Sequence, residues 1–410
     1  MRSEAAVTLP RLRVVRPGER SPAAIRAQAE RSMRRTLAML AVSVAALTMV
    51  GLVMVLSASS VSAFAEYGSS FLFFKRQLLY SVMGSVALLG AARLRYQVWQ
   101  RAWVPLLGLT FILLILVLHP SAGTVAGGAA RWIQVGPVSL QPSELAKFAV
   151  VAACASILAR NVKTLESDPV RWIVPLVFIV GGVSLLILLQ PDLGTMMVIA
   201  LTAFVLLFVA GVRLRLLLST AIVSGALGLA LIMGEGYRRT RFLSFLHPWS
   251  DPHHTGYQIV QSLIALGSGH LFGVGLGASR QKWMYVPNAH TDFIFAILGE
   301  ELGLIGELVI LALFGGLVYA GIRIALRAPD AFGRLLAGGI TAWLGLQALV
   351  NLGAVTGLLP ITGVPLPFVS FGGSSLIVSL AAVGVLLSIG RAALAGSSSA
   401  TGRSGWHRGW

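Results

Sequence analysis

The sequence predicts an all-α membrane protein with about ten transmembrane helices and one long extracytoplasmic loop. Hydrophobic residues make up 56% of the 410 residues and charged residues only 11%, a balance that soluble globular domains do not have. Apolar segments of about twenty residues, the length that crosses a bilayer, recur along the chain. Arginine clusters separate many of these segments, as they do in loops that fix membrane orientation.

The net charge of +17 does not indicate a nucleic-acid partner. The arginines lie between apolar segments, where they set topology. The single cysteine, Cys154, falls inside an apolar segment, which excludes an internal disulfide or a cysteine metal cluster. The start of the chain shows no cleavable signal peptide.

The elements follow in order along the chain. Residues 1–35 are rich in arginine and predict a flexible cytoplasmic tail. Residues 36–392 are expected to form one ten-helix domain, and the Gly/Ser/Arg-rich residues 393–410 a second cytoplasmic tail. Spans are expected at about 36–58, 77–92, 102–118, 144–159, 172–189, 196–212, 216–234, 292–323, 335–352 and 375–390. The loops expected inside each carry at least two Arg or Lys, so both termini are predicted to be cytoplasmic.

The long loop, residues 235–291, breaks this charge bias because it is basic although the count places it outside. Its cations are Arg238, Arg239, Arg241, Arg280 and Lys282. Positive charge against the orientation rule indicates an anionic ligand at the outer membrane surface. The loop also holds five of the seven histidines, but none has the i, i+4 spacing of zinc hydrolases, so zinc catalysis is disfavoured.

The end of this loop places Lys282, His290 and Asp292 at the edge of an apolar run. The chain has only 15 acidic residues, and a charged group near lipid is usually functional. The alternative is that Asp292 caps the following helix. Beyond it, Gly299, Gly303 and Gly306 form a small-residue stripe, which predicts close packing against a neighbouring helix.

Three further external segments carry polar residues that are expected to line or support a cavity. In residues 128–147, Glu144 and Lys147 are spaced to pair at a helix start, and a structural pair and a substrate contact both remain open. Irregular backbone at 353–374 is tolerated at membrane depth only beside protein or a wet cavity. The candidates for structural or cavity-lining roles are Arg131, Glu144, Lys147, Gln190, Asp192, Gln258, Ser370 and Ser374.

Five motifs together resemble the SEDS (shape, elongation, division and sporulation) family of FtsW and RodA proteins. They are Arg131-Trp132-Ile133 through Gln141–Lys147, Gln190–Thr195, Gly256-Tyr257-Gln258 with Gln261-Ser262, Tyr285–Gly306, and Gly363–Ser374. Residues Gly275–Ser279 followed by Lys282 resemble the division branch, FtsW. The family usually has a Glu two residues before the motif histidine, whereas this chain has Asn288.

The resemblance implies a glycosyltransferase that polymerises lipid II at the outer face of the cytoplasmic membrane, at the division septum. Asp292 matches the family's essential acid and would be the general base. Cations would stabilise the pyrophosphate leaving group; the candidates for substrate binding are Arg238, Arg239, Arg241, Lys282, His290 and Asn288. The sequence identifies no cofactor with certainty, and a divalent cation, magnesium or manganese, stays open as a cofactor. The metal ligands are unknown.

The implied partners are lipid II, a class B penicillin-binding transpeptidase and other division proteins. Two alternatives remain. A lipid II flippase also fits ten helices with charged groups along a cavity, although a flippase needs polar groups along its whole path and here Lys147 is the deepest clear candidate. A non-catalytic division scaffold is compatible with the arginine-rich tail.

Overall fold

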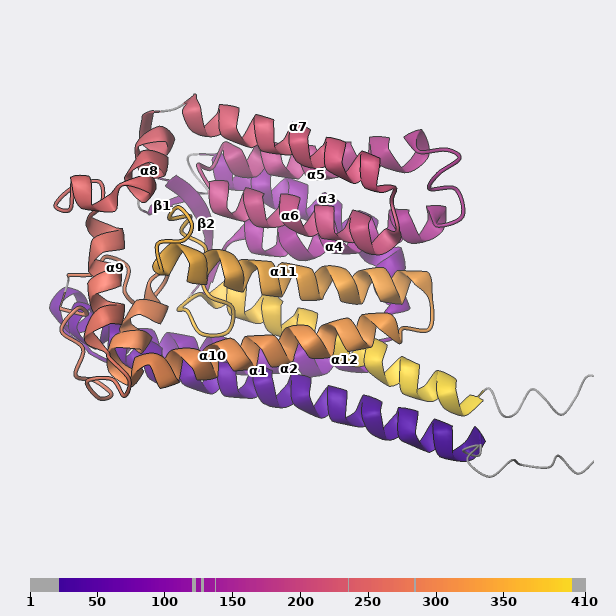
Figure 1. Ribbon diagram of the computed structural model, residues 1–410, viewed down its shortest axis with the longest axis horizontal. Coiled ribbons are helices and arrows are strands. Elements are labelled where there is room, and N and C mark those ends of the chain that lie inside the picture. The colour runs from indigo at the N-terminus through magenta and orange to yellow at the C-terminus, as the bar shows by residue number, and fades with distance from the viewer. Residues whose placement is uncertain are drawn as a thin grey trace, which may run out of the picture.

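The structure is a computed structural model that describes residues 22–119, 123–126, 129–136, 138–234, 236–283 and 285–399. Its described part contains ten long helices that run up and down one bundle (Figure 1). They are α1 (Pro22–Tyr67), α2 (Leu72–Arg93), α3 (Gln97–Leu118), α4 (Pro142–Asn161), α5 (Val170–Leu188), α6 (Leu193–Ala210), α7 (Leu214–Met233), α10 (Ile294–Leu326), α11 (Ala331–Val355) and α12 (Gly373–Ser399).

Nine of these described helices are long and apolar enough to cross a membrane. The tenth, α2, begins with Lys75 and Arg76 in its first turns and ends at Arg93, which lowers its mean hydropathy. It packs along α12 within the same bundle. The prediction of an all-α protein with about ten membrane helices is therefore confirmed.

The bundle has two distinct ends (Figure 1). The loop end carries the strands, the short helices α8 (Gly236–Leu246) and α9 (Tyr257–Ser268), and residues 269–293. The tail end carries the start of α1 and the end of α12. Arg93, Arg160 and Arg323 lie in the last turns of α2, α4 and α10, and Arg213 is the N-cap residue of α7.

Two boundaries differ from the expectation of flexible tails. Helix α1 already begins at Pro22, so residues 22–35 are helical, and α12 continues to Ser399. Residues 1–21 and 400–410 lie outside the described part of the chain. The apolar stretch marks only the part of each helix that can sit in lipid, and both helices continue beyond that part.

A small antiparallel sheet, which the sequence did not predict, lies between α3 and α4. Its strands are β1 (Thr124–Ala126), β2 (Ala129–Val135) and β3 (Val138–Leu140), in the order β1-β2-β3. The pairing of β2 with β3 brings Gln134 opposite Ser139. Strand β2 lies at the loop end of the bundle (Figure 1).

The centre of the bundle is formed by α4 and α11, whose residues are almost all buried. Helix α4 starts with Pro142 at its first turn and Glu144 nearby, a favourable start because the amide-free ring and the acid suit a helix N-terminus. Helix α7 is different. Only Leu217 of its residues is buried, and α7 lies at the outer edge of the bundle (Figure 1).

Helix α10 is broken at Gly303, which has φ 66° and ψ −169°. Only glycine adopts this backbone readily. The glycine stripe is thus not one regular helix face, because Gly303 separates a short first segment, residues 294–302, from the long remainder. The chain that follows α9 wraps around this break: Leu304 N donates to His270 O, and Val274 N donates to Glu300 O, both at 2.9 Å.

Candidate functional site

A cavity of about 1360 Å³ opens at the loop end of the bundle. One part is polar and is lined by β2, α9, residues 288–293 and residues 360–375. The other part is apolar and runs between α6 and α7; it is lined by Leu193, Met196, Met197, Ala200, Leu201, Phe204, Ala221, Gly225, Gly228, Leu229 and Ile232. The cavity can therefore hold a ligand with a polar head and a long apolar tail.

Asp292 lies in the polar part, directly before α10. Phe293 is the N-cap residue of α10 and has no side-chain cap, so Asp292 does not occupy the N-cap position expected under the capping alternative. A Cβ placed on Gly363 would stand 3.5 Å from Asp292 Oδ2. The carboxylate therefore faces residues 360–375, which form one wall of the cavity.

The backbone leading to Asp292 is held in place by hydrogen bonds to three consecutive carbonyl oxygens, those of residues 290–292. Phe371 N donates to His290 O at 2.9 Å, and Ser370 Oγ donates to Thr291 O at 2.6 Å. Asn351 Nδ2, on α11, donates to Asp292 O at 2.8 Å and to Val364 O at 2.8 Å. These bonds position Asp292, and Asn351 and Ser370 act through the backbone.

Asn288 begins this segment in the left-handed region, with φ 55°. Asparagine tolerates that conformation better than most residues. Its carbonyl accepts hydrogen bonds from Thr291 N and Thr291 Oγ1 at 3.0 and 3.1 Å, and its side chain lines the cavity. The residue that departs from the family pattern is thus well suited to the turn that presents Asp292.

Four charged residues among those described line the cavity: the acids Asp192 and Asp292, and the cations Arg76 and Arg131. Arg131 Nε donates to Gln190 O at 2.9 Å, and the same guanidinium contacts Pro191 O. Both partners are uncharged, so the positive charge of Arg131 is not neutralised by them. Arg76, at the start of α2, was not among the predicted site residues. It is nevertheless a cation near a turn that the charge count expects outside, as in residues 235–291.

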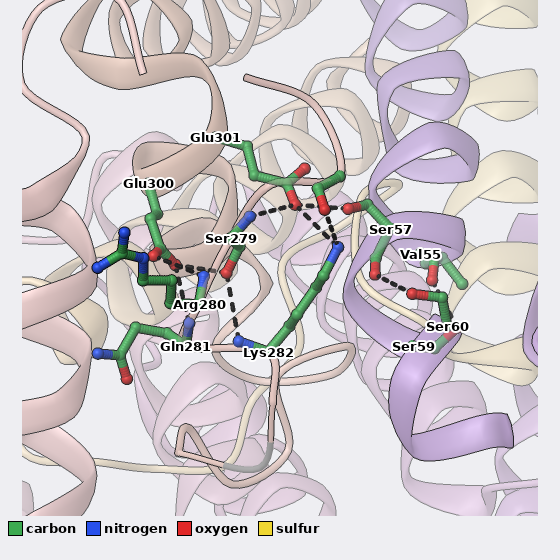
Figure 2. Close-up of polar contacts among 11 residues, drawn as sticks. Val55, Ser57, Ser59, Ser60, Ser279, Arg280, Gln281, Lys282, Glu300 and Glu301 are labelled. Carbon is green, nitrogen blue, oxygen red and sulfur yellow. Dashed lines mark hydrogen bonds and ion pairs between the residues drawn. The ribbon is translucent and has the colours of Figure 1, made fainter. Parts of the chain in front are cut away.

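The predicted site residue Lys282 lies elsewhere. Its ammonium is buried 3.7 Å from Glu301 Oε1 and donates to Gly277 O. Figure 2 shows that it belongs to a cluster joining residues 279–282 to Glu300 and Glu301 of α10 and to Ser57 of α1. Lys282 is not among the described residues that line the cavity, and its position is that of a structural cation.

Glu300 completes this cluster by accepting three hydrogen bonds from the chain before Asp292 (Figure 2). The donors are Ser279 Oγ, Arg280 N at 2.9 Å and Gln281 N at 3.3 Å. A buried carboxylate needs several donors to offset lost hydration. Glu300 and Glu301, which sequence reasoning did not single out, thereby tie the loop to the first segment of α10.

His290 is also placed away from the cavity lining. Its ring lies 4.6 Å from the ring of Phe73 and 5.7 Å from that of Phe371, centroid to centroid. Burial lowers the pKa of His290 to about 4. The imidazole is therefore neutral near pH 7 and packs as an aromatic ring.

The expected pair of Glu144 and Lys147 is present and fully buried, with Nζ 2.9 Å from Oε2. Lys147 Nζ also donates to Gln347 Oε1 at 2.6 Å, and Gln347 Nε2 donates to Pro365 O at 2.9 Å. The pair contacts the backbone of the 360–375 wall through Gln347 and does not line the cavity. This arrangement is a structural support, the first of the two alternatives that the sequence left open.

The remaining predicted residues divide between lining and support. Asp192 caps α6 by accepting from Thr195 N at 3.0 Å, while Gln190 is buried and donates to Leu114 O at 3.2 Å. Ser374 Oγ accepts from Gln141 N at 3.1 Å. The predicted residues that line the cavity are Arg131, Asp192, Gln258, Asn288, Asp292 and Ser374.

The three arginines of α8 stay a prediction. Arg239 is exposed and is not among the described lining residues. The side chains of Arg238 and Arg241 lie outside the described part of the structure. Phe242 of the same helix lines the cavity, so α8 lies beside it.

Comparison with known proteins identifies the family. The family model described as "Cell cycle protein", which covers FtsW, RodA and SpoVE, matches residues 37–394. The chain belongs to this FtsW/RodA/SpoVE family. The family resemblance that the motifs indicated is therefore confirmed.

Relatives and solved structures agree with this assignment. The chain is 47% identical over 343 residues to stage V sporulation protein E of Bacillus subtilis, covering 83% of this chain and 93% of that protein. It is 46% identical over 344 residues to the probable peptidoglycan glycosyltransferase FtsW of Geobacter metallireducens, covering 84% and 92%.

Among solved structures, a chain of a peptidoglycan synthase complex superposes with a TM-score of 0.71 at 30% identity, covering 86% of this chain and 96% of that chain. The rod shape determining protein RodA of Thermus thermophilus superposes with a TM-score of 0.63 at 31% identity, covering 86% and 95%.

Proposed function

We propose that this SEDS protein is a peptidoglycan glycosyltransferase that polymerises lipid II during cell division, with Asp292 as its general base. One observation carries the proposal: a carboxylate at the polar end of a cavity whose other end is an apolar groove. Relatives named FtsW glycosyltransferases share about 45% of their residues with this chain, which supports the same reaction.

The shape of the cavity matches the chemistry of lipid II. A polyprenyl chain is apolar and would lie between α6 and α7, where exposed α7 makes few contacts with the bundle and the groove meets lipid. The pyrophosphate and sugars would lie in the polar part, beside Arg76, Arg131 and Asp292. Pockets that fix a ligand usually combine an apolar surface with a few placed polar groups.

Glycosyl transfer needs a base and an anion-stabilising site. The acceptor sugar hydroxyl attacks the anomeric carbon, its proton passes to the Asp292 carboxylate, and the bond from that carbon to the pyrophosphate oxygen breaks. A positioned base contributes about 10²–10⁴-fold. The departing pyrophosphate takes the electron pair, and Arg76 and Arg131 would stabilise its negative charge.

A divalent cation is a further proposal for the same place. The Asp292 carboxylate and the Asn288 side-chain carbonyl are oxygen ligands of the kind that magnesium prefers. When bound, the ion would add positive charge beside the pyrophosphate. Among the described residues, no three His, Cys, Asp or Glu side chains gather as a ready-made metal site, so most ligands would come from the substrate and water.

Membrane orientation follows from charge. The arginines at the tail end favour a cytoplasmic position for this end. The cavity would then lie on the outer face, and the proposed role in division would put the protein at the septum. His253→Cys at the loop end, in a Cys154→Ser chain, should react with a membrane-impermeant thiol reagent in intact spheroplasts. Arg334→Cys at the tail end should react only after lysis, and the reverse pattern would contradict an external site.

The proposed partner is a single-span class B penicillin-binding transpeptidase together with other division proteins. The TM-score of 0.71 to a chain of a complex that couples polymerisation to crosslinking supports a similar assembly. A flippase reading is less well supported, because the described charged lining residues gather at the loop end and do not continue along the bundle.

The test is reconstitution of the full-length protein with its transpeptidase partner and lipid II. Glycan polymer on a gel is the expected product. A second assay measures the movement of fluorescent lipid II across vesicle membranes, through its accessibility to an external quencher. Lipid movement without polymer would identify a flippase. The absence of both activities would favour the scaffold.

A further inference from the structure

A second cavity, of about 760 Å³, lies at the tail end between the start of α1 and the end of α10. It is separate from the site described above, because the two cavities share no lining residue. Its polar lining consists of Arg31, Arg35, Arg323, Ser32, Thr36 and Tyr319, with Gln28 beside them. The start of α1 and the end of α10 both lie towards the tail end in Figure 1, and the two helices pack against each other.

The charged side chains among the described lining residues are all cations. Three arginines line the cavity, and no acidic side chain is among the described residues of its lining. Arg323 donates from Nη2 to Ser32 Oγ at 2.8 Å and from Nη1 to Tyr319 Oη at 3.3 Å. Both acceptors are neutral, so these bonds fix the guanidinium in place without neutralising it.

Two further atoms point to missing anionic partners. Arg323 Nε and Arg327 Nη1 are buried donors for which the described residues provide no acceptor. Burial and the neighbouring charge of Arg323 lower the pKa of Arg327. Unsatisfied buried donors of a cation are costly. Arg327 does not line the cavity, but an anion beside Arg323 would offset the positive charge that the two arginines share.

The position of the cavity suits an amphiphile. Arg323 lies in the last turn of α10, where the apolar run ends, which is the depth expected for lipid headgroups. Apolar side chains on the same two helices are exposed, among them Met49 on α1 and Ile322 on α10. A headgroup phosphate could contact the arginines while its acyl chains lie against these helices.

We propose that this cavity binds the phosphate headgroup of an anionic phospholipid, held by Arg31, Arg35 and Arg323. Basic pockets between helices on the cytoplasmic side commonly bind such headgroups. Arginine also matches phosphate oxygens with paired donors. The site does not depend on the glycosyltransferase activity.

General topological charge does not explain this arrangement. Arg34, Arg160 and Arg334 are also exposed arginines at the tail end, yet none lines the cavity. They provide a matched control, because replacing them removes the same charge from the same side of the membrane.

The experiment is native mass spectrometry of the full-length protein with phosphatidylglycerol or phosphatidylcholine of identical acyl chains. The wild type is expected to retain phosphatidylglycerol in preference. The triple variant Arg31→Gln, Arg35→Gln, Arg323→Gln should lose that preference by about tenfold or more, as expected for about three surface cations. The control triple Arg34→Gln, Arg160→Gln, Arg334→Gln should keep it.

An equal loss in both triple variants would overturn the proposal in favour of diffuse surface charge. Displacement by millimolar inorganic phosphate, with no lipid preference, would assign the cavity to a free anion. If the first triple variant failed to fold, Ala27→Cys in an otherwise intact Cys154→Ser chain replaces it. Phosphatidylglycerol vesicles should protect this lining position from a thiol reagent and leave Arg34→Cys reactive; equal reactivity in phosphatidylglycerol and phosphatidylcholine would contradict the site.

Discussion

Lys282 Nζ and Glu301 Oε1 lie 3.7 Å apart, and both side chains are almost completely buried. Ser57 Oγ donates to the same carboxylate oxygen at 2.6 Å, so the pair joins α1, α10 and the loop before Asp292. A cation that the sequence offered as a ligand for pyrophosphate is thereby placed in a structural role.

This pair predicts a stability defect for Lys282→Met. Removing one partner leaves the Glu301 charge buried and unpaired, which typically costs about 3–5 kcal/mol of unfolding free energy. The thermal unfolding temperature should fall accordingly. The KM of the folded fraction for lipid II should stay near the wild-type value. The double variant Lys282→Met, Glu301→Gln should recover much of the loss. A raised KM at unchanged stability would return Lys282 to the substrate site.

Arg76→Gln is predicted to weaken use of lipid II. Its side chain lines the cavity, and a lost charge-assisted hydrogen bond to phosphate costs about 1.5–3 kcal/mol, which raises the KM by about tenfold or more. Lys75→Gln, a neighbouring exposed cation outside the described lining, is the matched control. Polymerisation rates over a lipid II titration compare the two variants. Equal kinetics in both would remove Arg76 from the site.

Asn351→Leu is predicted to lower kcat more than it raises KM. The side chain donates hydrogen bonds to the carbonyls of Asp292 and Val364, and a base displaced by about 1 Å can lose about 10²-fold in rate. Ser262→Ala removes a buried hydrogen bond to Val355 O at the same end of α11 and serves as control. A matching loss of kcat in both variants would indicate a general effect on packing.

His290 predicts a pH dependence of stability. Burial lowers its pKa to about 4, from 6.5 in an unfolded chain, so the unfolded state binds more protons between these values. The stabilisation is fully present above pH 6.5 and is lost as the pH falls towards 4, by up to about 3 kcal/mol. The thermal unfolding temperature should be lower at pH 5 than at pH 7.5, and His290→Phe should reduce this difference. An unchanged pH dependence in that variant would contradict the assignment.

The membrane helices could be predicted from the sequence, because a bilayer requires apolar segments of a defined length. Nine of the described helices meet those criteria. The sheet at β1–β3 could not be predicted in the same way, since its strands are short and its stability depends on neighbouring helices. The helical start of α1 at Pro22 was also missed, because charged residues outside lipid carry no hydropathy signal.

The site was predictable where residues act through their own chemistry. Asp292, Arg131 and Asn288 were singled out and line the cavity. Lys282 was assigned to substrate because its partner, Glu301, lies nineteen positions on, in the short first segment of α10, and no sequence pattern links the two residues. Arg76 was overlooked, although it breaks the same charge rule that drew attention to the long loop.

The central claim is that Asp292 is the general base of glycan polymerisation. The most direct test is the yield of glycan polymer from lipid II by Asp292→Asn, reconstituted with the transpeptidase partner at matched protein levels. We expect a loss of at least about 10²-fold, with thermal stability retained. Asp251→Asn, which removes an acid from the same end outside the described lining, should stay active. Near-normal polymer from Asp292→Asn would contradict the account.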